Sequence, residues 1–221
     1  MDIRNKILST SEDLFTEHGI KQVSMDNIAE ALAISKKTIY QIFPNKKELV
    51  LCVIQMYLEQ EEKMISEIKS RELNAIDEMI EITRNILSFF KNMSPLLIYD
   101  LKKYHPEGWK LIEERHFTFI KSVIRDNIQR GISQGIYRSD LDSEIIAKFY
   151  VQLSVIASDE QIFPPKAYPI QALFIQKVTY HLHGIVNESG KRKLINWSKE
   201  MENDMMSNKQ NQRDNPLLNL I

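Results

Sequence analysis

Glycine, cysteine and long apolar runs are all scarce in this sequence. Its 221 residues include six glycines and a single cysteine, Cys52. One cysteine excludes an intramolecular disulfide framework and fits a reducing compartment. Apolar runs such as LLIYDL fall far short of the roughly 20 residues that a membrane-spanning helix needs. Because the charged start shows no signal peptide, we expect a cytoplasmic protein that does not cross a membrane.

An excess of charge of either sign is also missing. Lysine and arginine total 29, aspartate and glutamate total 30, and the formal net charge is -1. No overall field therefore drives the chain onto nucleic acid or an anionic membrane, and any site for a polyanion must be local. One local candidate is the stretch AISKKTIYQIFPNKKELV, residues 33–50, which has four lysines but only one carboxylate, Glu48.

Helical periodicity runs through most of the chain. Apolar residues recur at three- and four-residue spacing, which predicts an all-α protein. The first helix is expected over about residues 3–18, and Gly19 follows it where a left-handed C-terminal cap belongs. Ser24 is the predicted N-cap of a short second helix, and Asp26 in its first turn suits the positive end of that helix.

Two more helices are predicted in the lysine-rich stretch. Ser35 caps a third helix of about two turns, which Pro44 ends because the residue before a proline avoids helical geometry. Asn45, with Glu48 three residues later, resembles a capping box and opens a fourth helix that continues to about residue 70. The short turn between the second and third helices is the pattern of a helix-turn-helix.

The third helix has an apolar and a polar face. Ile39, Ile42 and Phe43 lie at i, i+3 and i+4, so we expect them to face the core. The other face carries amines, an amide and hydroxyls, which can reach base edges and phosphate oxygens. Its residues are Lys36, Lys37, Thr38, Tyr40 and Gln41. Lys46 and Lys47, beside the free amides of the fourth helix, add a second phosphate site. The lysines are therefore predicted to face double-stranded DNA rather than solvent alone.

The segment VSMDNIAEALAISKKTIYQIFPNKKELV, residues 23–50, resembles the N-terminal DNA-binding segment of the TetR family of bacterial transcriptional regulators. The matching positions are Ser24, Ile28, Ala29, Ile34, Ser35, Thr38, Tyr40, Phe43, Lys46, Glu48 and Leu49. This resemblance implies a ligand-responsive regulator, expected to be a repressor, that binds a palindromic operator as a homodimer.

The resemblance also implies roles for single residues. The predicted DNA-binding residues are Ser35, Lys36, Lys37, Thr38, Tyr40, Gln41 and Lys46. By resemblance, Thr38, Tyr40 and Lys46 would hold phosphates. The residues that would meet bases are Lys36, Lys37 and Gln41.

Two positions depart from the family pattern. Ala33 stands in the turn where the family usually has glycine, and a non-glycine residue in left-handed geometry costs roughly 1–2 kcal/mol. Lys37 stands where a small residue is common, so the base preferences of the family do not transfer to this chain.

The second half of the chain predicts a dimer interface. Residues 106–135 read as one long helix, and residues 143–158 and 168–188 as a helical hairpin that is apolar on more than one face. One face would pack on its own domain and the other on a second copy, which resembles the four-helix dimer interface of the family. The alternative is that both faces are buried in one large core. A dimer would place two recognition helices about 34–36 Å apart, as successive major grooves of a palindrome require.

Aromatic side chains are the candidates for the pocket of an unknown small-molecule effector. The predicted lining residues are Phe89, Phe90, Tyr104, Trp109, Phe117 and Tyr150. His181 and His183 are two residues apart, which places them on opposed faces of a helix, so no metal site is predicted there. We find no phosphate loop or nucleophile motif and predict neither a cofactor nor an enzyme.

Three regions are expected along the chain. They are a helix-turn-helix DNA-binding domain (1–46), a helical ligand-binding and dimerisation domain (47–205) and a flexible polar tail (206–221). Two alternatives stay open. The first is a helical protein-interaction module that has lost DNA binding. The second is an activator, because the residues do not say whether a bound dimer blocks or recruits polymerase.

Overall fold

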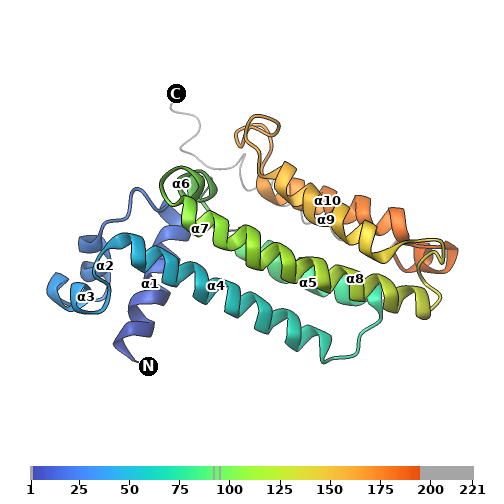
Figure 1. Ribbon diagram of the computed structural model, residues 1–221, viewed down its shortest axis with the longest axis horizontal. Helices are drawn as coiled ribbons and strands as arrows, with labels where there is room; N and C mark the ends of the chain where they lie inside the picture. The colour runs from blue at the N-terminus through green and yellow to red at the C-terminus, as the bar shows by residue number, and fades with distance from the viewer. Residues whose placement is uncertain (1, 92, 95, 195–221) are drawn as a thin grey trace, which may run out of the picture.

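The predicted all-α class is confirmed by the computed structural model, which describes residues 2–91, 93–94 and 96–194 (Figure 1). Three short helices gather at one end of the molecule, and a long fourth helix leads away from them along the bundle. Their bounds are Ile3–His18 for α1, Met25–Ala31 for α2, Lys36–Ile42 for α3 and Lys46–Lys69 for α4. In the described part of the chain, the only β contact is an isolated bridge between Tyr137 and Val186.

The remaining helices form the larger part of the bundle. Their bounds are Ala75–Phe90 for α5, Leu96–Tyr104 for α6, Pro106–Leu111 for α7, Phe117–Ser133 for α8, Ser143–Ala157 for α9 and Ile170–Ile185 for α10. The long helix predicted over residues 106–135 differs in one respect, because a π-helical segment, η1 (Ile112–His116), separates α7 from α8. Such wider turns often occur at functional sites. The predicted tail, 206–221, lies outside the described residues.

Side-chain caps fix where the first helices begin. Ser24 Oγ accepts a hydrogen bond from the Asn27 N–H at 3.1 Å, and Asn27 Oδ1 accepts the Ser24 N–H at 2.9 Å. Ser35 and Asn45 each accept the N–H three residues on, at 3.1 and 2.9 Å. The predicted N-caps of α2, α3 and α4 are therefore confirmed, and the turn between α2 and α3 is set by local chemistry.

The apolar face of α3 packs as predicted. Ile39 and Phe43 are buried, and they share one core with Phe15 of α1 and Ile28 of α2. The same core continues into α4 and includes Leu101 of α6. The helix-turn-helix is thus packed on α4 and α6 without a break at residue 46.

Two backbone positions have positive φ in the first domain. Gly19, after α1, has φ 81° and ψ 155°, so its φ is positive as predicted but its ψ lies outside the left-handed helical region. Ala33, in the turn between α2 and α3, has φ 52°. An alanine therefore occupies a conformation that favours glycine.

Replacing Ala33 with glycine is expected to raise the free energy of unfolding by about 0.5–1 kcal/mol. Relief of roughly 1–2 kcal/mol of backbone strain is partly offset by roughly 0.4–1 kcal/mol of extra freedom in the unfolded chain. Urea denaturation of both proteins measures the difference. Ala31→Gly, at a position with negative φ, is the control and should destabilise. A glycine at residue 33 that also destabilises would contradict the account.

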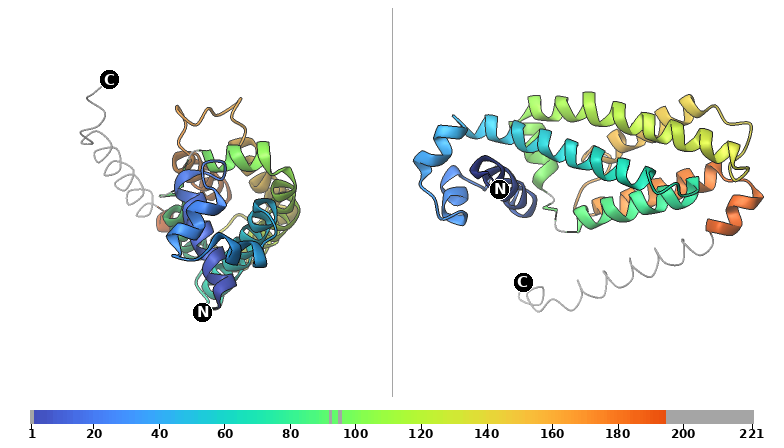
Figure 2. Two further views of the ribbon diagram at one scale, coloured as in Figure 1. Left: turned by 90° about the vertical axis from the view of Figure 1, so that its left-hand side faces the viewer. Right: turned by 90° about the horizontal axis from the view of Figure 1, so that it is seen from below.

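A second core holds the larger domain together. Side chains of α5, α8, α9 and α10 form one buried cluster around Ile76, Ile128, Val178 and Leu182. The α9–α10 hairpin lies at the edge of the bundle against α5 and α8, away from α3 (Figures 1 and 2). Among the described residues, no helix covers the opposite side of the hairpin.

Candidate functional site: the polar face of α3 and a cavity

The polar face of α3 is exposed at the end of the molecule (Figure 1). Lys36, Lys37, Tyr40 and Gln41 are exposed, and the Tyr40 side chain is 42% accessible although it is aromatic. Thr38 is half-buried, and its hydroxyl lies 2.8 Å from Ser35 Oγ. All five residues of this predicted face therefore lie on one helix, and four of them are open to solvent.

The lysines around α3 differ in their partners. Lys36 Nζ lies 2.7 Å from the carboxylate of Asp26, and Lys47 Nζ lies 2.8 Å from that of Glu107. Lys37 forms no ion pair or side-chain hydrogen bond within the part of the chain that the structure describes. Both ion pairs are exposed and contribute little to stability. These cations can therefore exchange their carboxylates for phosphates at small cost.

Lys46 is placed differently from the phosphate contact that the resemblance implies. Its ammonium donates to the carbonyl of Ile20, and partial burial lowers its pKa, although Asp100 opposes this shift. Asp100, buried in α6, accepts the backbone N–H of Lys21 at 2.7 Å. In this arrangement Lys46 and Asp100 hold the loop between α1 and α2 from two other helices.

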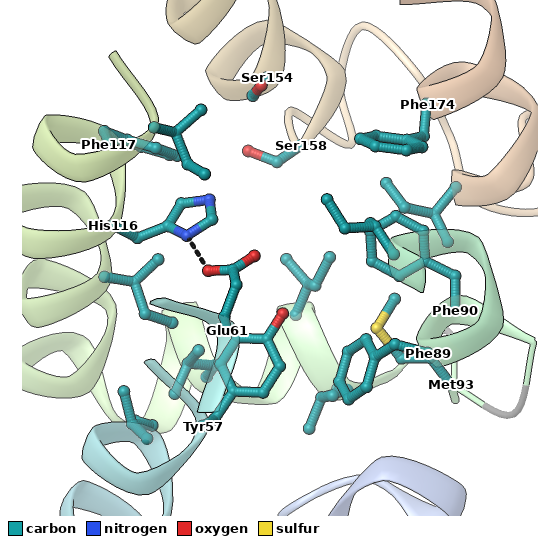
Figure 3. A pocket seen from close by; sticks show the side chains of 18 of the residues that line it. Tyr57, Glu61, Phe89, Phe90, Met93, His116, Phe117, Ser154, Ser158 and Phe174 are labelled. Atoms are coloured by element: carbon teal, nitrogen blue, oxygen red, sulfur yellow. Dashed lines mark hydrogen bonds and ion pairs between the residues drawn. The ribbon is translucent and has the colours of Figure 1, made fainter. Parts of the chain in front are cut away.

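A cavity of about 260 Å³ lies between the helices of the bundle (Figure 3). Its lining is mostly aliphatic and aromatic and comes from α1, α4–α10 and η1. Five of the predicted aromatic residues belong to it. They are Phe89, Phe90, Trp109, Phe117 and Tyr150. The prediction for Tyr104 was wrong, because this side chain is 42% exposed and its ring faces the ammonium groups of Lys21 and Lys103.

Aromatic rings form one wall of the cavity. Tyr57 and Phe89 have ring centroids 4.9 Å apart, and Phe90 and Phe174 have theirs 5.4 Å apart. The two pairs meet where Phe89 contacts Phe90. Figure 3 shows the thioether of Met93 beside Phe89 and Phe90. We call the four rings of these two pairs the aromatic wall; it runs from α4 across α5 to α10.

Two polar groups face each other on the opposite side. Glu61, buried on α4, and His116, in η1, are joined by a 2.6 Å contact between the carboxylate and Nδ1 (Figure 3). The π-helical segment contributes His116 to the lining and so brings an imidazole to a mostly apolar site. The carboxylate of Glu61 is thus engaged by a residue of the protein.

Besides His116, the described lining of the cavity contains one basic side chain, that of Lys177. Its ammonium donates to Ser154 Oγ at 2.7 Å and lies 4.2 Å from the ring centroid of Tyr150 and 4.8 Å from that of Phe174. Burial lowers the pKa of Lys177 to about 7, and Glu61 opposes that shift. No carboxylate of the described residues forms an ion pair with it. The ammonium is therefore held by a hydroxyl and two rings, without a counter-ion.

Glu61 and Lys177 were not found from the sequence. Glu61 lies four residues from both Tyr57 and Ile65, on the apolar stripe of α4, and Lys177 stands between Phe174 and Val178 in an apolar helix. A charged residue inside a predicted apolar stripe is the signal that could have revealed both. Such a residue needs a partner or a cavity.

Exposed apolar side chains gather on the free side of the α9–α10 hairpin. On α9 these are Ile145, Phe149 and Ile156, spaced by four and seven residues along one stripe. Phe149 is 62% exposed, and Tyr180 of α10 is 75% exposed. We call these four residues the hairpin face. A cluster of large apolar side chains on neighbouring helices is typical of a protein interface.

Among the described residues, no helix is long and apolar enough to span a membrane. No group of three or more histidine, cysteine, aspartate or glutamate residues among them could hold a metal ion.

The sequence model of the family described as "Bacterial regulatory proteins, tetR family" matches residues 7–53. This match spans most of α1, all of α2 and α3 and the start of α4. Residues 7–53 therefore form a TetR-family helix-turn-helix segment. The chain is a transcriptional regulator with this DNA-binding segment.

Relatives that align over a longer part of the chain are distant in sequence. The uncharacterized HTH-type transcriptional regulator YvaF of Bacillus subtilis is 21% identical over 173 residues, which is 76% of this chain and 85% of YvaF. The transcriptional activator FasR of Mycolicibacterium smegmatis is 25% identical over 52% of this chain but only 47% of its own length. The transcriptional repressor KstR2 of Mycobacterium tuberculosis is 20% identical over 66% of this chain and 74% of its own.

Solved structures of similar fold align with most of this chain. One is a protein of Saccharomonospora viridis, described as a transcriptional regulator and solved in complex with choline. It has a TM-score of 0.61 and 19% identity over 84% of this chain and 98% of its own. At this identity the likeness concerns the fold alone.

Proposed function

We propose that this protein is a ligand-responsive repressor of the TetR family that binds a palindromic operator as a homodimer. The observation that carries the proposal is the capped α3, which exposes Lys36, Lys37, Tyr40 and Gln41 on a single face. Amines and an amide on a short recognition helix are the groups that read base edges in a major groove. The relative KstR2 is a transcriptional repressor, which supports repression as the outcome of binding.

The hairpin face is the proposed dimer interface. One α3 is only seven residues long, so a single copy contacts few bases. Pairing of α9 and α10 with the same helices of a second copy would bury Phe149 and Tyr180 and bring a second α3 to the next major groove. Dimerisation therefore accounts both for the exposed apolar residues and for the small size of the DNA-reading helix.

The cavity is the proposed effector site, and α4 and α6 are the proposed connection to DNA. Both helices line the cavity, through Ile54 and Leu101 among others, and both hold the loop between α1 and α2. In that loop, Lys46 of α4 donates a hydrogen bond to the carbonyl of Ile20, and Asp100 of α6 accepts one from the N–H of Lys21. A ligand that binds more tightly to one arrangement of these helices would shift the population toward it and change the separation of the two α3 helices.

Substitutions on the α3 face should separate affinity from specificity. Tyr40→Ala is expected to weaken binding of all DNA sequences by about tenfold, because a lost phosphate contact carries no sequence information. Gln41→Ala should instead relax the preference at particular bases, where a good contact contributes about 1–3 kcal/mol of discrimination. Selection of random duplexes by each purified variant measures both effects. Gln55→Ala, at an exposed position on α4, is the matched control.

Two results would count against this assignment. A Gln41→Ala profile identical to that of the wild type would remove the base-reading role of α3. Equal affinities of Tyr40→Ala and wild type for every sequence would remove the phosphate role of Tyr40.

Activation is the second candidate function, since the relative FasR is a transcriptional activator. Transcription in vitro from the selected operator would distinguish the two, because a repressor lowers and an activator raises the yield of transcript.

A further inference from the structure

We propose that the effector is an apolar monocarboxylate whose carboxylate binds Lys177 and Ser154 while its body lies along the aromatic wall. This inference rests on the proposed role of the cavity as the effector site. It names the chemical class of the ligand, the end of the cavity that takes its charge and the residues that recognise it.

The first argument is the missing counter-ion of Lys177. An ammonium group taken out of water is costly unless a charge of opposite sign accompanies it. Here the group has one hydroxyl and two aromatic rings, and no carboxylate of the described residues pairs with it. A bound anion would supply the missing partner. Charge-assisted hydrogen bonds of this kind are among the stronger contacts in proteins.

The second argument is the position of the group within the cavity. Lys177 comes from α10 and Ser154 from α9, and both line the cavity, so a carboxylate can meet the ammonium and the hydroxyl together. Phe174, at the end of the aromatic wall, lies beside the same ammonium. A ligand anchored at Lys177 can therefore extend along the wall toward Phe90 and Phe89.

The third argument concerns the rest of the lining. Apart from Lys177, Glu12 and the Glu61–His116 pair, the lining is mainly isoleucine, phenylalanine and other apolar residues, so the ligand body must be apolar. The volume of about 260 Å³ lies just below the roughly 300–1,000 Å³ of ordinary ligand pockets, which favours a chain of medium length. The carboxylate of Glu61 faces the same cavity and would repel a second anionic group. A single negative charge at one end therefore fits better than two.

A cationic amphiphile bound to Glu61 is the rival class. Its positive charge would meet an aromatic wall, which suits a quaternary ammonium. However, His116 already engages Glu61, and the ammonium of Lys177 occupies the rings of Tyr150 and Phe174. A second cation would also be repelled by Lys177. The lining therefore favours an anion.

Calorimetric titration of the full-length protein, without DNA, tests the proposal. The three probes share a ten-carbon chain and differ only in the head group: decanoate, decanol and decyltrimethylammonium, each below its micelle concentration. We expect decanoate to bind most tightly. Lys177→Met should weaken decanoate by about tenfold or more but leave decanol unchanged or tighter, because only the charged contact is lost. Ser154→Ala should weaken decanoate by a smaller factor.

Lys166→Met is the control variant. It removes an exposed lysine of the loop between α9 and α10 and should leave the affinities for all three probes unchanged. Unchanged decanoate affinity in Lys177→Met, tighter binding of decyltrimethylammonium than of decanoate, or no binding of any probe would each overturn the proposal. None of these results bears on DNA binding, which is measured separately, so the proposed function can survive the loss of this inference.

Discussion

Phe149→Glu is expected to convert the proposed homodimer to a monomer and to lower its affinity for operator DNA by about 100-fold or more. The Phe149 side chain is 62% exposed in the isolated chain, so the substitution costs the fold little. At a two-fold interface, however, two glutamates would be buried close together without partners, which is strongly unfavourable. Loss of the second recognition helix then removes the avidity of about 10²–10⁴ that two linked sites provide.

Sedimentation equilibrium measures the oligomeric state, and fluorescence anisotropy with a duplex operator measures the affinity. Tyr104→Glu is the control for oligomeric state, because it changes an exposed aromatic residue of α6 that is not part of the hairpin face. Circular dichroism establishes that both variants remain helical. If Phe149→Glu stays dimeric, α9 and α10 do not form the interface, and another surface must bring the two α3 helices together.

Lys177→Met is expected to raise the free energy of unfolding at pH 7 by about 2–3 kcal/mol. Burial lowers the pKa of Lys177 to about 7 in the folded protein, from its ordinary value of 10.5. This shift corresponds to an upper limit of roughly 5 kcal/mol, at about 1.36 kcal/mol per pKa unit. Methionine has a similar length and suits an apolar cavity. The expected gain is below the limit because the rings and Ser154 compensate part of the desolvation.

The gain in stability from Lys177→Met should become smaller as the pH rises above 7. Between about pH 7 and pH 10.5 the unfolded chain holds a proton on Lys177 more often than the folded chain does, so the stability of the wild type rises with pH. Below about pH 7 both forms are protonated and the cost is constant. Urea denaturation at matched protomer concentration should show the largest difference between variant and wild type near pH 7 and a smaller one near pH 10. A lower stability of Lys177→Met at pH 7 would contradict a desolvated ammonium.

The first domain could be predicted closely because its signals are local. Ser24, Ser35 and Asn45 are N-caps, and each acts on a residue within three positions. The apolar spacing of Ile39 and Phe43 likewise fixes which side of α3 is exposed. Features of this kind depend on neighbouring residues, and a sequence pattern contains them directly.

The cavity could be predicted only in part because its geometry is not local. Aromatic residues indicated some of its lining, but Tyr104 was misplaced, since periodicity does not tell which helix will cover a given face. The contact between Glu61 and His116 joins residues 55 positions apart and depends on the wider turn of η1. Lys46 was assigned to phosphate, whereas the carbonyl that holds it belongs to a loop 26 residues earlier.

Selection of genomic and random DNA fragments by the purified protein, at about 150 mM salt, tests the central claim most directly. Salt at this level suppresses non-specific phosphate binding. The account predicts enrichment of a palindrome whose half-sites lie about one helical turn apart, with the preferred bases weakened in Gln41→Ala. No enriched sequence, from folded protein freed of co-purified ligand, would contradict operator binding and favour the protein-interaction alternative.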